Sequence, residues 1–246
     1  MSGQLMLHCG GQVATIEDLA RVDLPERTSS YTPVPHQDLV RLVDERICKE
    51  FPGVECEWDF GLNRDGKQFF AVAQLQLDQE DMNMAYAIQN SYDGSLKFKG
   101  AGGADVFCCD NLAIMGSSVQ VARKHTGNAW EDIRRLVFTT VPDCMDQYDE
   151  MRLQLGKMKE IPVTTDRGYE VIGRALGRGI LTAQQGSVAI KEWKDPAFDE
   201  FKELPENMYR LYNAFTEAGK HGRAGTFMDR YTGFHDFFTP GGQVIH

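Results

Sequence analysis

The sequence predicts an α+β protein, because strand patterns gather in the first half of the chain and helix patterns in the second. Alternating apolar residues and glycine-containing turns indicate an antiparallel β-meander between residues 54 and 109. We expect one helix before this meander, and a long helix and a helical C-terminal part after it. At 246 residues the chain is long enough to bury a sizeable core.

The first helix is predicted over His36 to Phe51, where apolar residues recur at three- and four-residue intervals until a Pro-Gly pair ends the pattern. Two strands follow, Val54 to Phe60 and Lys67 to Leu77. The Asn-Arg-Asp-Gly sequence between them is a turn signal, since glycine adopts positive φ without strain. The second strand alternates in apolar character, as a half-buried strand does.

The rest of the meander lies on either side of the turn from Tyr92 to Gly94. Strands are expected at Met84 to Ser91 and Ser95 to Lys99. A glycine-rich bend from Gly100 to Gly103 then leads to a strand from Val106 to Cys109. Short turns between consecutive strands make all of these pairings antiparallel.

A long helix is expected after Asn128, its capping residue, with apolar positions at helical spacing as far as Leu155. Pro142 should kink or split this helix. We expect all the helices to lie on one side of the sheet. The remaining helices are predicted at Thr165 to Arg178, Ala183 to Lys194 and Pro205 to Lys220.

These patterns divide the chain into four parts. They are a loosely structured lead-in (residues 1–35), an α+β core domain (36–160), a helical C-terminal region packed on that core (161–236) and a flexible tail (237–246).

The charge argues against a protein that coats duplex DNA, because the formal net charge is -10. It is uneven, however: residues 1–90 carry 15 acidic and 7 basic residues, whereas residues 91–135 carry 5 and 6. This uneven charge leaves room for a local basic groove.

The six cysteines show no metal-ligand spacing, so we expect neither a metal nor a cofactor. The absence of a signal peptide and of a long apolar run predicts a cytoplasmic protein with free thiols and no membrane partner.

Basic residues concentrate in one part of the chain, on a predicted strand and around the start of the long helix. Such a set would suit a phosphate backbone, with Tyr92, Phe98 and Phe107 as candidates for base stacking. The alternative is an ordinary solvated surface, with the aromatic residues in the core. The candidate nucleic-acid-binding residues are Lys97, Lys99, Arg123, Lys124, Arg134 and Arg135.

A second group of polar residues surrounds the turn after residue 91. It could form a ligand site, or it could be a turn stabilised by its own side chains. A Cys–His pair within it could act as a nucleophile only if the thiol ionised, and buried structural thiols are the alternative. The candidate residues are Asn90, Ser91, Asp93, Cys109, Asn111 and His125.

Several short segments, in this order and spacing, resemble the phage/plasmid-like proteins grouped as domain of unknown function 932. They are Ser30 to Val43, Arg64 to Phe70, Gln89 to Ser95, Val106 to Leu112, Lys124 to Thr126, Arg178 to Leu181, Lys191 to Trp193 and Leu211 to Glu217. The resemblance implies a setting on bacteriophages, plasmids or integrated mobile islands. It implies no particular activity.

Two functions from different classes follow as hypotheses. The first is a non-enzymatic protein that binds or anneals single-stranded nucleic acid and forms a homo-oligomer. Its basis is the basic residues and an element order similar to that of single-strand annealing recombinases. The second is an interaction protein that inhibits a host defence or restriction factor, suggested by the acidic first 90 residues. An enzyme using Cys109, His125 and Asp93 is a third possibility.

Overall fold

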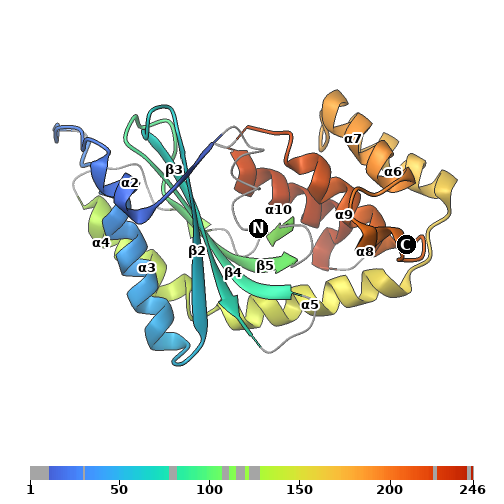
Figure 1. Cartoon of the computed structure of the whole chain (residues 1–246), viewed down its shortest axis with the longest axis horizontal. Coiled ribbons are helices and arrows are strands. Elements are labelled where there is room, and N and C mark those ends of the chain that lie inside the picture. The colour runs from blue at the N-terminus through green and yellow to red at the C-terminus, as the bar shows by residue number, and fades with distance from the viewer. Residues whose placement is uncertain are drawn as a thin grey trace.

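The computed structural model shows a seven-stranded antiparallel sheet with the strand order β1-β2-β3-β4-β5-β6 and with β7 also paired to β5 (Figure 1). The structure describes residues 11–29, 31–77, 82–106, 111–114, 120–121, 128–223, 226–242 and 245.

The strands are β1 (Gln12–Ala14), β2 (Glu55–Asn63), β3 (Gln68–Gln76), β4 (Met82–Ser91), β5 (Lys99–Val106), β6 (Asn111–Ile114) and β7 (Gln120–Val121). The helices are α2 (Ile16–Arg21), α3 (His36–Glu50), α4 (Ala129–Thr140), α5 (Cys144–Glu160), α6 (Thr165–Gly177), α7 (Ala183–Lys194), α8 (Asp199–Lys202), α9 (Met208–Gly219), α10 (Phe227–Phe238) and the 3-10 turn η3 (Pro240–Gly242). The predicted α+β class is therefore confirmed: α3 precedes the meander, and helices follow it.

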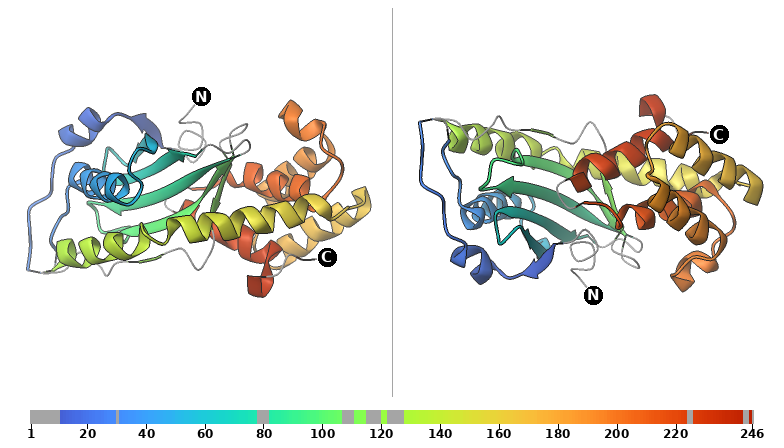
Figure 2. Two further views of the ribbon diagram at one scale, coloured as in Figure 1. Left: turned by 90° about the horizontal axis from the view of Figure 1, so that it is seen from below. Right: turned by 90° about the horizontal axis from the view of Figure 1, so that it is seen from above.

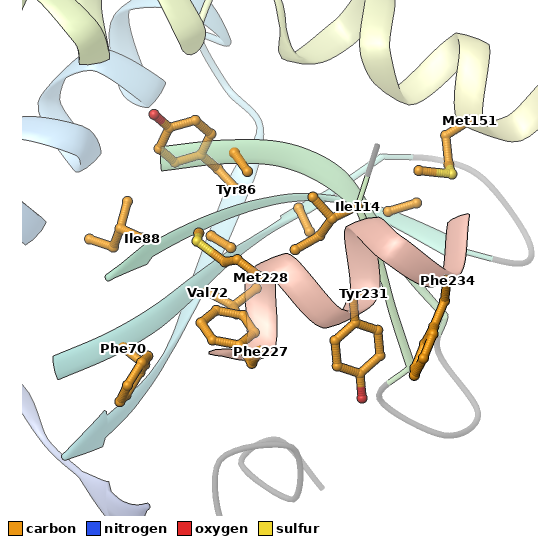
Figure 3. Close-up of a cluster of buried hydrophobic side chains, with 14 of the residues drawn as sticks. Phe70, Val72, Tyr86, Ile88, Ile114, Met151, Phe227, Met228, Tyr231 and Phe234 are labelled. Atoms are coloured by element: carbon orange, nitrogen blue, oxygen red, sulfur yellow. The ribbon is translucent and has the colours of Figure 1, made fainter. Parts of the chain in front are cut away.

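Helices cover both faces of the sheet. Phe69 of β3 stacks on His36 of α3, whereas the next residue, Phe70, makes an edge contact with Phe227 of α10. Successive side chains of a strand point to opposite faces, so α3 and α10 lie on opposite faces. Figure 3 shows α10 with Phe227 and Met228 against the sheet. The expectation of helices on one side is wrong, because Phe69 and Phe70 are both fully buried and each face needs a cover.

Helices α4 and α5 lie on the same face as α3. Tyr86 is directly opposite Ala73, which shares a face with Phe69, and its hydroxyl lies 2.6 Å from Thr140 Oγ1 of α4. Seen from below, α4 and α5 run in succession along the molecule toward the C-terminal helices (Figure 2). Helix α5 contacts both the sheet and α9, and so it joins the two halves of the chain.

The predicted glycine-rich bend is in fact part of strand β5, which runs from Lys99 to Val106. Small residues are needed there because helices press on this strand. A Cβ atom on Gly102 would lie 2.3 Å from Gln147 Oε1 and 3.1 Å from Cys144 Sγ, both on α5. The predicted strand from Ser95 to Lys99 is likewise wrong up to Phe98, since these residues form bends that lead into β5.

Helix boundaries follow local signals where these are strong. The long predicted helix is split into α4 and α5 around Pro142. Helix α7 has the predicted limits because Thr182 forms a capping box with Gln185. Helix α9 begins at Met208, three residues later than predicted, because the Asn207 side chain accepts a hydrogen bond from the Arg210 amide.

Several elements have no counterpart among the sequence predictions, β7 and the 3-10 turn η3 among them. Strand β1 pairs with β2, and the short helix α8 follows α7. Helix α10 continues past residue 236, where the predicted helical region ended, and it buries Phe227, Tyr231, Phe234 and Phe238. The predicted strand over residues 106–109 lies largely outside the described residues, and β6 begins at Asn111.

Candidate functional site

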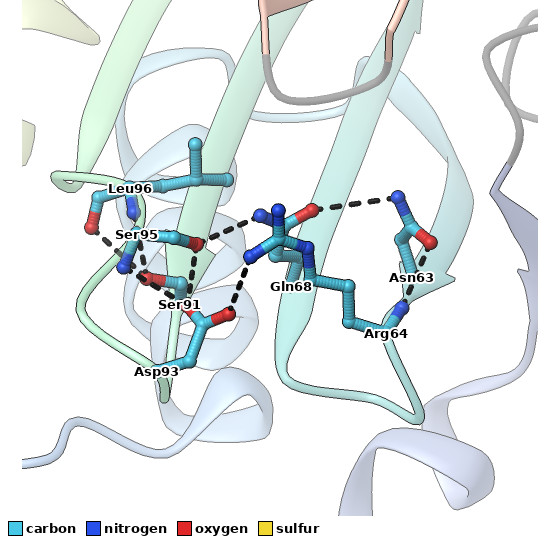
Figure 4. A network of polar contacts seen from close by, with 7 residues as sticks. All are labelled: Asn63, Arg64, Gln68, Ser91, Asp93, Ser95 and Leu96. Carbon is cyan, nitrogen blue, oxygen red and sulfur yellow. Dashed lines mark hydrogen bonds and ion pairs between the residues drawn. The ribbon is translucent and has the colours of Figure 1, made fainter.

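The polar turn predicted as a ligand site is bonded internally (Figure 4). The Ser91 hydroxyl donates to the Leu96 carbonyl at 3.0 Å and accepts from the Leu96 amide at 2.9 Å. One oxygen of Asp93 accepts hydrogen bonds from the amide and hydroxyl of Ser95, and the other pairs with Arg64 Nη1 at 3.1 Å. These contacts give the turn its shape. The side chains of Ser91 and Asp93 therefore have a structural role.

Partial burial alone would raise the pKa of Asp93. The hydrogen bonds from the Ser95 hydroxyl and amide, together with the Arg64 guanidinium, outweigh burial and hold the pKa of this carboxyl below its usual value. Asp93 is therefore a carboxylate at neutral pH, and it is unsuited to act as a general acid there.

Asn90 supports a buried histidine. Its Nδ2 donates to the Val34 carbonyl and to His36 Nδ1, each at 3.0 Å. The Val34 carbonyl can only accept, so it fixes the orientation of the Asn90 amide. His36 Nε2 lies 3.0 Å from the Gly66 carbonyl, which requires the hydrogen on Nε2. Asn90 and His36, both fully buried, thus form a structural cradle.

Two of the three aromatic residues considered for base stacking are part of the core. Phe98 is fully buried, and Tyr92 is 7% exposed and stacks on His36. Burial raises the pKa of Tyr92, although a hydrogen bond from the His36 amide opposes the shift. Phe107 lies outside the described residues.

The structure places four of the six basic candidates, in three settings. Lys97 is exposed next to the turn, and Lys99 pairs with Asp229 of α10. Arg134 and Arg135 are exposed on α4, which covers the opposite face of the sheet from α10. These four residues therefore do not form one continuous strip. Arg123 and Lys124 lie outside the described residues.

The cysteine–histidine pair also lies outside the described residues, as does the side chain of Asn111. Two of the thiols that the structure places, those of Cys56 and Cys144, are poor nucleophiles. Burial raises the pKa of Cys56 to about 12 and raises that of Cys144 further, so that neither ionises at neutral pH. Among the described residues no group of three or more His, Cys, Asp or Glu side chains could hold a metal ion.

A feature that the sequence did not suggest is an open groove of about 1,090 Å³ in the C-terminal half. Its walls are the loop between α6 and α7, the first turn of α7, the loop between α9 and α10, and the first half of α10. We call it the arginine groove, because its charged lining consists of Arg223, Arg230 and Asp229, beside His221.

The two arginines present their charge differently. Arg223 is exposed on the loop, and it forms no ion pair with any described residue. Arg230 is half-buried, and its Nη1 donates to the Arg223 carbonyl at 3.2 Å and to Thr226 Oγ1 at 3.1 Å. Its guanidinium packs so closely over Gly222 that a Cβ atom there would lie 2.0 Å from Nη1. Arg230 is therefore held in place, whereas Arg223 can reach toward a ligand.

The Asp229 carboxylate pairs with Lys99 on the sheet. In the charged lining, Arg223 therefore has no ion-pair partner among the described residues, and Arg230 lies beside it on the same surface. Lys99 and Asp229 are 130 residues apart, so no local sequence signal could have placed them together. In the segment from Gly222 to Arg230, the one sequence signal for the groove is a glycine next to an arginine.

These features define an α+β protein with a helix-covered antiparallel meander and an open groove lined by arginine. The model of one protein family, described as domain of unknown function (DUF932), matches residues 24–235, and the chain therefore belongs to this family. The resemblance found in the sequence is confirmed. Neither the curated proteins nor the solved structures gave a match. None of the described helices has the length and apolar character needed to cross a bilayer.

Proposed function

We propose that this protein binds single-stranded nucleic acid without chemical catalysis, and that the arginine groove contacts the phosphate backbone. We further propose that the protein acts in the bacterial cytoplasm and is encoded by a phage or other mobile element. As a homo-oligomer it would also anneal complementary strands. The observation that carries the proposal is that Arg223, which is exposed and has no ion-pair partner among the described residues, lies beside the pre-oriented Arg230 on one open surface.

Guanidinium suits this ligand because its planar set of N–H donors matches phosphate oxygens in a bidentate manner. Arg230 is pre-oriented by its contacts to the α9–α10 loop, so that less conformational freedom is lost on binding. The more mobile Arg223 can then follow a neighbouring phosphate along the strand.

The open shape of the groove also favours an extended ligand. Enclosed pockets bury most of a small substrate, whereas this groove is open to solvent along its length. Since Tyr92 and Phe98 are buried, the described part of the chain supports backbone contact more than base stacking. We therefore expect little dependence on base sequence.

The direct test compares two charge-removing variants by fluorescence anisotropy with a labelled oligo-dT of about 40 nucleotides. Arg223→Gln should weaken binding several-fold at 50 mM salt, because one phosphate contact is lost. Arg41→Gln is the matched control: Arg41 is exposed on α3, on the opposite face, and pairs only weakly with Asp38 at 3.9 Å. Equal losses in the two variants would remove the groove from the proposal.

The alternative, inhibition of a host defence factor, is supported by a separate acidic surface. Glu55, Glu57 and Asp59 alternate along β2 and therefore share one face, with both glutamates exposed. If this surface is the functional one, Glu55→Gln with Glu57→Gln should abolish a stoichiometric complex with a host enzyme in nuclease-treated lysate. The same pair of substitutions should leave oligo-dT binding unchanged or strengthen it if the groove is the functional site.

A further inference from the structure

Asp229 lies where the arginine groove meets the sheet. It belongs to the first turn of α10 and lines the groove, and its carboxylate forms an ion pair with Lys99 Nζ of β5. The two side chains differ in exposure: 61% of Asp229 is exposed, against 14% of Lys99. Solvent or a ligand in the groove therefore reaches the carboxylate more readily than the ammonium group.

We propose that Asp229 is an internal competitor for phosphate. This inference rests on the proposed function. In the free protein the Asp229 carboxylate occupies the contact with Lys99, and in the complex a phosphate of the bound strand occupies the same contact. A phosphate that approaches Lys99 from the groove meets this carboxylate first and must displace it. Lys99 then becomes a third cation for the strand, beside Arg223 and Arg230.

The neighbouring residue on α10 shows why the competition is local. Arg230 is held toward the α9–α10 loop by the Arg223 carbonyl and Thr226. Asp229 is instead drawn to the sheet by Lys99. Consecutive helix residues are about 100° apart around the axis, so the first turn of α10 sends its two charges in different directions. The carboxylate thus affects Lys99 most and leaves the guanidinium of Arg230 in place.

A simpler role for Asp229 is to stabilise the N-terminus of α10, where an acidic side chain is favourable in any orientation. Under that reading alone, replacing it would lower stability and leave binding unchanged. Competition predicts a gain in affinity, which a purely structural residue does not produce.

The test measures oligo-dT binding by Asp229→Asn at 50 and 200 mM salt. We expect roughly threefold tighter binding at 50 mM, since an exposed ion pair changes an equilibrium by up to about fivefold. The slope of log affinity against log salt should steepen by about 0.7, the value for one added phosphate contact on a single strand. If Asp229→Asn folds poorly in thermal melts, Asp229→Ala removes the same charge with a better helix-forming residue and serves instead.

Two controls make the result specific. Asp199→Asn removes the same charge from a comparable exposed pair with Lys202, outside the groove, and should not change affinity. In a Lys99→Met background, Asp229→Asn should give no gain, because its target is gone. A gain that persists there, or an unchanged affinity in Asp229→Asn, overturns the inference while wild-type binding still supports the proposed function. Absent wild-type binding overturns both.

Discussion

The His36 ring stacks face to face on the Tyr92 ring, with centroids 3.8 Å apart and planes 3° from parallel. The His36 amide also donates to the Tyr92 hydroxyl at 2.8 Å. The first residue of α3 is thereby fixed to the turn that follows β4. Because Asn90 holds the same histidine from β4, the helix, the strand and the turn form one rigid unit.

We predict that Asn90→Ala destabilises the protein by about 3 kcal/mol. The change leaves the Val34 carbonyl and His36 Nδ1 buried without a donor, and each such group costs about 1–3 kcal/mol. Urea denaturation measures the effect. Ser95→Ala, in the exposed part of the turn, is the control and should cost less than about 1 kcal/mol. Similar losses in the two variants would contradict the cradle.

A second prediction concerns His235, which is buried between Tyr212 and Gln154 on helices α9 and α5. Burial lowers the pKa of His235 from 6.5 to about 4 in the folded state. The unfolded state therefore takes up the proton first as the pH falls. The stability that neutral His235 provides is complete above pH 6.5 and is lost between pH 6.5 and 4, by about 3 kcal/mol.

His235→Gln cannot titrate, so its unfolding free energy should depend less on pH over this range. Urea denaturation at each pH gives the unfolding free energy of both proteins. The difference between the two pH profiles reports His235, since the contributions of the carboxyl groups that both proteins share cancel. Parallel profiles would show that His235 takes up its proton without unfolding and would contradict the burial argument.

A third prediction uses two glycines near α5. Gly102→Ala should cost about 1–3 kcal/mol, because the new Cβ would lie 3.1 Å from Cys144 Sγ and 2.3 Å from Gln147 Oε1, so that the Gln147 side chain must move and α5 must give slightly. Gly156→Ala, within α5 and with no atom within 4 Å of the added Cβ, should instead stabilise by about 0.5–1 kcal/mol. Thermal melts should give shifts of opposite sign. A neutral Gly102→Ala would mean that α5 does not press on β5.

Local signals predicted much of the fold. Pro142 marked the break between two helices, and the helix predicted at Ala183 to Lys194 has the same limits as α7. These signals act over a few residues and need no knowledge of distant contacts. The sequence predicted a bend at Gly100 to Gly103 because the side chains that require a small residue at Gly102, Cys144 and Gln147, lie more than 40 residues away.

The candidate site was harder to predict for the same reason. The polar turn at Ser91 to Ser95 resembles a ligand site in sequence, but its groups bond to one another once Arg64 and Gln68 are brought beside it. The arginine groove depends on α10, which the sequence analysis did not detect, and on the pairing of Lys99 with Asp229 across the fold. Neither relationship is encoded at short range.

Salt dependence of oligo-dT binding by the wild-type protein tests the central claim most directly. If Arg223 and Arg230 contact phosphates, the slope of log affinity against log salt should be about -1.4 or steeper, at about -0.7 for each contact on a single strand. Binding should then be measurable at 50 mM salt and weaken steadily toward 200 mM. Absent binding at 50 mM, or an affinity that does not change with salt, would contradict the account.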